Sequence, residues 1–295
     1  MQQRIALISD VHGNQTALTA VLADAERQGA TEYWYLGDLL MPGPGTNSLF
    51  ELLNQVNLTV LLKGNWDNFI FEMTNLGSAT VDLTNTQDVY IAALVQYVKQ
   101  TLKPAYYRQL DQAPIQQTIQ RAGLTFSLTH NLPLRNYGHQ LLPFQEQANF
   151  NRLFSEAPKN KNRVDIAIYG HTHHQIMRTS QTDQLVINPG SIGQPYSAWP
   201  RLFTDHRSQY ALLSLDEQGY DGLEFRKVSY DLTAELKIAR QQKLPYFELY
   251  QQVCETGLAS THNPVALDQL NQRYGYVAQV HQFLQQLDQQ LNANK

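Results

Sequence analysis

The chain has 295 residues, and its apolar fraction of 42% predicts a folded protein with a sizeable core and excludes a disordered one. A net charge of −4 provides no positive field that would gather a polyanion, so long nucleic acids are disfavoured as ligands. The single cysteine, Cys254, excludes intrachain disulfides and thiolate metal clusters, which is compatible with a reducing compartment.

The first segment predicts a buried strand followed by a helix. Residues 4–9 form an apolar run that ends at Asp10, as expected of a strand covered on both faces. Apolar residues at helical spacing follow, with Asn14 as the N-cap and Gly29 as the C-terminal stop. Because Asp10 interrupts the run before a signal peptide or a membrane span could develop, we expect a cytoplasmic protein without membrane contacts.

Strand-like and helical patterns then alternate, which predicts an α/β fold. A predominantly helical stretch lies at 86–112, and the further apolar runs are at 33–36, 59–62, 124–129, 164–169 and 185–188. Ligands in α/β sheets gather at the carboxyl ends of strands. The residues that follow these runs are of the types such sites use: Gly37-Asp38, Gly64-Asn65, His130, Gly170-His171 and Pro189-Gly190-Ser191.

The end of the chain follows a different pattern. Runs at 209–215 and 223–230 predict a hairpin, and residues 231–295 are predicted to be helical. No linker separates two units, so we expect a main domain at 1–230 and a helical extension at 231–295 that packs on it. Apolar residues at spacings of three and four predict an amphipathic helix that packs either on this domain or against a second subunit, in a homodimer: Leu267, Leu270, Tyr274, Val277, Val280, Leu284 and Leu287.

Several of the residues after the apolar runs are potential metal ligands. Asp10 and His12 are two residues apart, and in extended backbone such side chains project to the same side, so the pair can share one ion. His171 and His173 repeat this arrangement. Asp38, Asn65 and His130 complete the set of potential ligands. Seven ligands exceed the needs of one ion and suit two ions that share Asp38. The full set is Asp10, His12, Asp38, Asn65, His130, His171 and His173.

Each motif alone has an ordinary structural explanation. An aspartate before a helix is a common cap, two nearby histidines are more often on the surface, and Gly-Asp or Gly-Asn pairs are turn signals. The prediction of a metal centre therefore depends on the whole set, in which each member follows an apolar strand.

In this order the motifs resemble the calcineurin-like metallophosphoesterase superfamily. The resemblance covers about residues 4–230, and the segment from Asn188 to Gly193 is similar to one in the small prokaryotic members related to bacterial phosphodiesterases. It implies a four-layer α/β/β/α sandwich of two facing mixed β-sheets, with the metals at one edge and the C-terminal helices outside the shared fold. It also implies a ligand division in which Asp38 bridges the ions, Asp10, His12 and His173 bind the first, and Asn65, His130 and His171 bind the second.

The sequence departs from the superfamily pattern at three positions. Trp66 stands where many relatives carry a histidine proposed to protonate the leaving group, so the general acid is unassigned. Asn131 replaces a usual glycine, and Tyr196 stands where a basic residue often contacts phosphate. Asn14 has two interpretations, a phosphate contact or a helix cap, and Asp67 either orients a ligand histidine or forms a simple turn.

The expected function is hydrolysis of a phosphate ester. Two divalent ions would bring four positive charges against the two negative charges of Asp10 and Asp38, lowering the pKa of a bridging water and attracting the substrate. We expect attack by metal-bridging hydroxide on a phosphodiester, or less favourably a phosphomonoester. Asp38, Asn65 and His130 would be catalytic, and Asn14 and Asn65 would bind the substrate. Nitrogen and oxygen ligands suit Mn, Fe or Zn, and the four imidazoles argue against Mg or Ca.

Other functions and substrates stay open at this stage. The main alternative is a non-catalytic scaffold for protein binding, since the superfamily includes one, although all seven ligand positions are competent here. A nuclease is a third interpretation, disfavoured by the lack of a basic stripe. We expect a phosphate-ester substrate of modest size, and dinucleoside polyphosphates, cyclic nucleotides, phosphoproteins and small phosphodiesters all stay open.

Aromatic and further histidine side chains receive ordinary interpretations. Trp66, Tyr137, Tyr196 and Trp199 could stack on a substrate ring, but packing in the core or at a rim is the better prediction. Surface positions are the default for the histidines without partner spacing, namely His139, His174, His206, His262 and His281.

Overall fold

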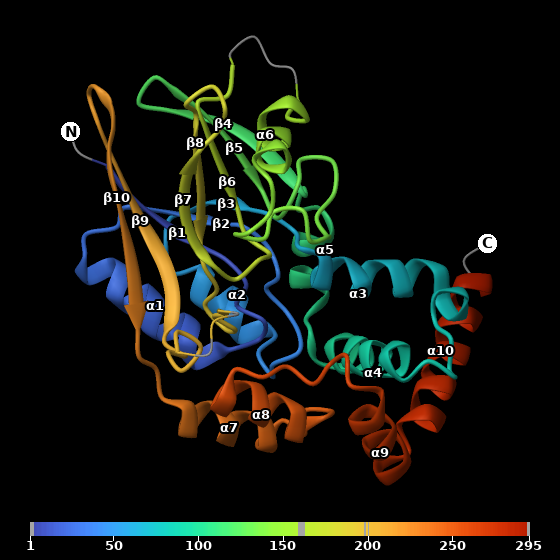
Figure 1. Ribbon diagram of the computed structural model, residues 1–295. Coiled ribbons are helices and arrows are strands. Elements are labelled where there is room, and N and C mark those ends of the chain that lie inside the picture. The colour runs from blue at the N-terminus through green and yellow to red at the C-terminus, as the bar shows by residue number, and fades with distance from the viewer. Residues whose placement is uncertain (1–2, 159–162, 198, 200, 294–295) are drawn as a thin grey trace.

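Two five-stranded sheets form the centre of the molecule in the computed structural model, which describes residues 3–158, 163–197, 199 and 201–293 (Figure 1). The first sheet has the order β10-β9-β1-β2-β3, with β1 (Gln3–Ile8), β2 (Glu32–Tyr35), β3 (Leu58–Leu61), β9 (Ser208–Asp216) and β10 (Gly219–Val228). The second has the order β4-β5-β6-β8-β7, with β4 (Gln116–Arg121), β5 (Leu124–Thr129), β6 (Ile166–Tyr169), β7 (Gln175–Thr179) and β8 (Leu185–Pro189).

Both sheets are mixed. The strands β1, β2 and β3 are parallel, and the hairpin of β9 and β10 adds antiparallel strands at one edge. In the second sheet β5, β6 and β8 are parallel, and β4 and β7 are antiparallel edge strands. The hairpin was predicted from the sequence, whereas β4 and β7 were not. Their residues are half-exposed and polar in large part, so neither shows the apolar run of a central strand.

The inner faces of the two sheets share one apolar core. Trp34 of β2 and Phe126 of β5 are fully buried there, with their rings edge to face at 5.2 Å. Strands covered on both faces have continuous apolar sequences, which is why the central strands could be predicted. The residues of this core from β1, β3, β6 and β8 include Ile5, Leu7, Val60, Ile166, Ile168 and Ile187.

Helices cover the outer faces. On the first sheet, α1 (Gln15–Arg27) and α2 (Asn47–Leu53) contribute to a core that includes the outward residues Ile8 and Tyr35. On the second sheet, α6 (Gln147–Ser155) packs Phe150 and Leu153 against Tyr169. The predicted four-layer α/β/β/α sandwich is therefore confirmed.

The remaining helices lie beside the sandwich (Figure 1). From the middle of the chain come α3 (Asn65–Leu76), the 3-10 helix η1 (Gly77–Thr80), α4 (Thr86–Thr101) and α5 (Pro104–Asp111). From the C-terminal extension come α7 (Leu232–Gln241), α8 (Phe247–Thr256), α9 (Pro264–Tyr274) and α10 (Tyr276–Ala293). Among the residues described, no helix combines the length and the apolar character needed to cross a membrane.

The last helices pack on this chain. The single amphipathic helix expected near the C-terminus is wrong in part, because α9 and α10 are separate helices that meet at Gly275, where glycine ends a helix readily. In α10, Phe283, Leu284 and Leu287 are buried in a core shared with α3 and α4. These contacts lie within one chain, and packing against a second subunit stays a prediction.

We predict that the C-terminal extension unfolds together with the sandwich. Leu284→Ala should lower the free energy of unfolding by about 2–5 kcal/mol, because it opens a cavity in the core shared by α10 and α4. Val277→Ala on the same helix is the control, since Val277 is 40% exposed and its loss should cost about 0.5 kcal/mol or less. Urea titrations followed by tryptophan fluorescence and circular dichroism measure both. Two separate unfolding transitions would contradict shared packing. An equal loss of unfolding free energy in Leu284→Ala and Val277→Ala would contradict it as well.

Candidate metal centre

All seven predicted ligands come together at one edge of the sandwich. They follow the carboxyl ends of parallel strands: Asp10 and His12 after β1, Asp38 after β2, Asn65 after β3, His130 after β5, and His171 and His173 after β6. Because the two sheets face each other, these strand ends from both sheets meet over one small volume.

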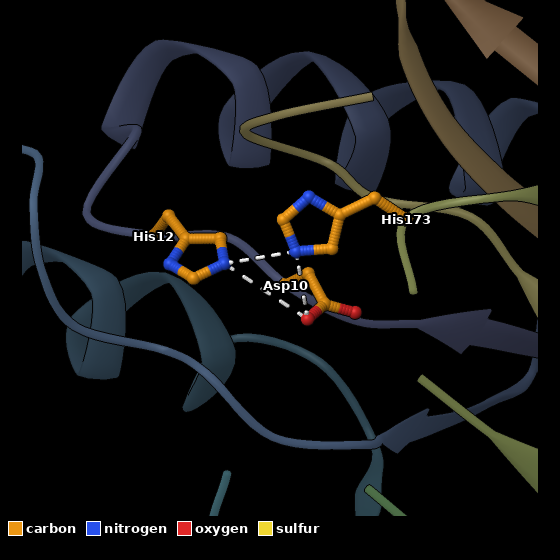
Figure 2. A group of neighbouring side chains, drawn as sticks. All are labelled: Asp10, His12 and His173. Carbon is orange, nitrogen blue, oxygen red and sulfur yellow. Dashed lines mark hydrogen bonds and ion pairs between the residues drawn. The ribbon is translucent and has the colours of Figure 1, made fainter. Parts of the chain in front are cut away.

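The first group consists of Asp10, His12 and His173, whose side chains point toward one another (Figure 2). The Nε2 atoms of His12 and His173 are 3.1 Å apart. Asp10 Oδ1 lies 3.3 Å from His173 Nε2 and 3.9 Å from His12 Nε2. One potential ligand atom from each residue lies within 4.8 Å of the others, so the three can hold one ion.

The second group consists of Asp38, His130 and His171, again with ligand atoms within 4.8 Å of one another. The amide oxygen of Asn65 joins this group, 3.2 Å from His130 Nε2. Asp38 Oδ2 lies 3.3 Å from His130 Nε2 and 3.7 Å from His12 Nε2 of the first group. The Asp38 carboxylate therefore stands between the two groups, where a bridging ligand belongs.

Each ligand histidine uses its other ring nitrogen on a backbone carbonyl. The Nδ1 atoms of His12, His130 and His173 donate to the carbonyl oxygens of Met41, Leu36 and Gln194 at 2.8, 2.8 and 2.6 Å. His171 is reversed, because its Nε2 donates to the Gly138 carbonyl at 3.0 Å. Such bonds fix the ring orientation, and they leave the other ring nitrogen facing the centre.

The two carboxylates are also fixed through one oxygen each. Asp10 Oδ2 accepts from the His171 backbone N–H at 3.0 Å, and Asp38 Oδ1 accepts from the Trp66 backbone N–H at 2.8 Å. Asp10 Oδ1 is buried and has no hydrogen-bond partner among the described residues. A buried carboxylate oxygen that faces imidazoles and lacks a hydrogen bond is suited to a cation. This donor set of nitrogen and oxygen atoms fits a pair of divalent ions.

The electrostatics of the cluster favour positive charge at its centre. Burial raises the pKa of Asp10 and Asp38, but nearby histidines outweigh burial and lower the pKa of both carboxyls below their ordinary range. Burial lowers the pKa of His130, yet the charges of Asp38 and Asp10 raise it to about 9. Burial and the neighbouring His130 lower the pKa of His171 to about 4. Both carboxylates are thus ionised at neutral pH, as metal ligands must be.

The comparisons with known proteins agree with this geometry. Residues 3–218 match the calcineurin-like phosphoesterase superfamily domain. The chain belongs to this superfamily. A search of curated proteins finds MJ0912 from Methanocaldococcus jannaschii, 26% identical over 262 residues that cover 83% of this chain and 95% of that protein.

Two solved structures show the superfamily fold at low sequence identity. The hypothetical protein PH1004 from Pyrococcus horikoshii OT3 has a TM-score of 0.67 at 19% identity, covering 87% of this chain and 99% of that one. A metallophosphoesterase from Sphaerobacter thermophilus has a TM-score of 0.63 at 21% identity, covering 88% and 100%.

The backbone of this calcineurin-like centre differs from the expectation. We predicted that Asp10 and His12 share a face because their backbone is extended, and this reason is wrong. Both have positive φ, at 55° and 51°, as do Asp38, His171 and His173. Left-handed backbone is unfavourable for residues with a Cβ and persists where surrounding structure imposes it. The side chains converge because tight loops aim them, not because a strand alternates.

Asp67 supports the loop that carries Asp38. Its carboxylate accepts hydrogen bonds from the backbone N–H groups of Asp38, Leu39, Leu40 and Gly64 at 2.9 to 3.2 Å. The expectation that it orients a ligand histidine is therefore wrong, and its role in the turn before α3 is confirmed. Burial and the charge of Asp38 raise the pKa of Asp67 to about 6.

The two asparagines singled out in the sequence have distinct contacts. Asn14 caps α1, because its Oδ1 accepts from the Ala17 N–H at 3.0 Å. Its Nδ2 is buried, and the Asn14 side chain also interacts with Tyr230. Asn131 donates through Nδ2 to the Gly138 carbonyl at 3.0 Å, the same carbonyl that receives His171 Nε2. It therefore helps to position a ligand histidine.

A cleft of about 420 Å³ opens over the ligands Asp38, His171 and His173. Trp66 and Tyr196 line it, whereas Tyr137 and Trp199 are not among its lining residues and are exposed. Its wall also includes His139 and His262, both of which are exposed, as predicted from the sequence. No local spacing marks them, because they reach the cleft only through the tertiary fold.

We predict that Gly64→Ala weakens metal binding by about 10–100-fold, the range typical when support for a metal ligand is lost. A Cβ at this position would lie 1.9 Å from Asp38 Oδ1 and 2.4 Å from the Asp38 backbone nitrogen, so Asp38 must move. Gly222→Ala in β10 is the control, because a Cβ there meets nothing within 4 Å. Metal titration calorimetry on the stripped proteins measures both. Unchanged affinity in Gly64→Ala would contradict the proposed place of Asp38.

Proposed function

We propose that this protein is a dinuclear-metal phosphoesterase that prefers phosphodiesters to phosphomonoesters. The observation that supports it most strongly is the position of Asp38, whose Oδ2 lies within 3.7 Å of a histidine from each ligand group. The proposed ligands are Asp10, His12 and His173 for one ion, Asn65, His130 and His171 for the other, and Asp38 for both. The metal is Mn, Fe or Zn, since histidine-rich sites without sulfur suit these ions.

When bound, two divalent ions would supply the positive charge that activates water and polarises the phosphate oxygens. The side chains of the protein prepare this site in advance. The backbone carbonyls of Met41, Leu36 and Gln194 hold three imidazoles in a single orientation, so little reorganisation is needed when substrate arrives. The Nδ2 group of Asn14 would donate to a phosphate oxygen, and the Asn65 amide would help to orient the ester.

A phosphodiester is the favoured substrate because the segment from Asn188 to Gly193 is similar to one in members related to bacterial phosphodiesterases. Trp66 leaves the general acid unassigned for either ester, because an alcohol leaving group with a high pKa needs a proton donor and an indole ring offers no acid of suitable pKa. The same substitution supports the alternative of a non-catalytic scaffold that binds protein partners. The complete and preorganised ligand set counts against that alternative. A cytoplasmic location and a homodimer stay predictions.

The test is hydrolysis of bis-p-nitrophenyl phosphate and p-nitrophenyl phosphate by metal-stripped protein given Mn, Fe(II), Zn or Mg. We expect a transition metal to restore activity, with the diester cleaved faster. Asp38→Asn should lower the rate by about a hundredfold or more, because it removes the shared charge between the ions. Asp205→Asn is the control, since Asp205 pairs with Arg207 and Lys227 outside the cleft.

The alternatives give different results in this test. Two bound ions with no hydrolysis of either ester would contradict the phosphoesterase and favour the scaffold. Failure to bind any of the four metals would contradict the metal centre itself.

A further inference from the structure

The far wall of the cleft comes from the C-terminal extension. Leu258, Ala259, Thr261 and His262, which connect α8 to α9, line the same cleft as the ligands Asp38 and His173. These residues lie outside the segment that matches the calcineurin-like domain, which ends at residue 218. The extension thus contributes a wall that the shared domain does not provide.

Both ends of this connection are held in place. At one end, Gly257 has a φ of 70°, and a Cβ there would lie 2.8 Å from Phe203 Cζ and 2.7 Å from His206 Cε1. The backbone therefore approaches these rings as closely as only glycine allows. At the other end, Gln87 of α4 contacts His262 Nδ1 at 3.0 Å. The connection is thus in contact with the rest of the fold at both ends.

Other parts of the cleft wall are aromatic, namely Trp66 and Tyr196. Trp66 is half-buried, with its ring edge to face with His12 at 5.8 Å, with Phe69 at 6.0 Å and with Tyr90 at 6.5 Å. Tyr196 packs edge to face on Phe203 at 5.6 Å. Trp66, Tyr196 and Leu258 therefore place apolar surface around the space above the ligands.

The charge of the cleft is concentrated at its base. Among the described residues that line the cleft, Asp38 is the sole carboxylate and none is lysine or arginine. Recognition of a second phosphate normally uses a guanidinium or ammonium group. His139 and His262 offer ring nitrogens for hydrogen bonds instead. A polyphosphate chain would therefore enter this cleft without counter-charges beyond the metal centre.

We propose that Trp66, Tyr196 and the 257–262 segment form a subsite for the uncharged, aromatic arm of an ester that carries one phosphate. This inference rests on the proposed function, because it places the phosphate at the metal ligands. The volume of about 420 Å³ lies in the range of small-ligand pockets, large enough for an aryl group or a single nucleoside. Polyphosphates such as dinucleoside polyphosphates are poor ligands of this subsite.

The test measures binding rather than turnover. Phenylphosphonate and methylphosphonate are titrated by calorimetry into the Mn-loaded protein, since neither has an ester to cleave. We expect phenylphosphonate to bind about tenfold more tightly, because its ring buries apolar surface against Trp66 and Leu258. Ala259→Trp fills the subsite from an exposed position and should reduce the preference to about twofold or less, with methylphosphonate binding unchanged.

Ala278→Trp is the matched control, because Ala278 is exposed on α10 of the same extension and does not line the cleft. It should keep the tenfold preference. Leu258→Ala is a second variant, which removes apolar surface from the cleft instead of filling it. It should lower the preference for phenylphosphonate over methylphosphonate several-fold. A preference retained in Ala259→Trp would overturn the subsite.

A charged probe tests the absence of basic residues. We expect 4-carboxyphenylphosphonate to bind several-fold more weakly than phenylphosphonate, because its second charge meets no lysine or arginine. Equal or tighter binding would overturn the requirement for an uncharged arm. Methylphosphonate binding without a phenyl preference rejects the subsite alone, whereas failure of both phosphonates to bind rejects the phosphate site on which the subsite rests.

Discussion

The position of the Asp38 carboxylate is the constraint on which the site depends. One oxygen is fixed by the backbone N–H of Trp66, and the other faces imidazoles of both ligand groups. Asp67, itself buried, holds three successive backbone N–H groups of the loop that begins at Asp38. Two carboxylates close together in a buried region repel each other, which is consistent with the raised pKa of Asp67. A pair of cations at the proposed site would relieve that repulsion.

The sandwich makes this arrangement available. Ligands from β1, β2 and β3 belong to one sheet, and ligands from β5 and β6 belong to the other, so the cluster forms only where the two sheets face each other. The core around Trp34 and Phe126 sets that relation, because it packs the inner faces of both sheets together. Asp10 shows how closely the layers are joined: its Oδ2 accepts from the backbone of His171, which follows a strand of the opposite sheet.

Much of this could be predicted from the sequence, for a physical reason. Central parallel strands are buried on both faces, so they appear as apolar runs, and the polar residues after them mark the functional edge. The edge strands β4 and β7 lack that signal because one side of each meets solvent. The left-handed backbone at Asp10 and His12 leaves no trace in composition, since neither residue is a glycine. The break at Gly275 was visible as a glycine, but the apolar spacing continues across it and suggested one helix.

His139 and His262 illustrate what local patterns cannot reveal. They are 123 positions apart in the sequence (262 minus 139) and line one cleft because the extension turns back over the sandwich. The proposed metal ligands require particular chemistry at strand ends, so their pattern is regular and recognisable. A wall for the substrate requires only shape and apolar surface, which many sequences supply. If the proposed subsite binds the substrate, changes in the extension would alter the arm that the cleft accepts while Asp10, Asp38 and the histidines keep the same geometry. Specificity and chemistry would then be carried by separate parts of one chain.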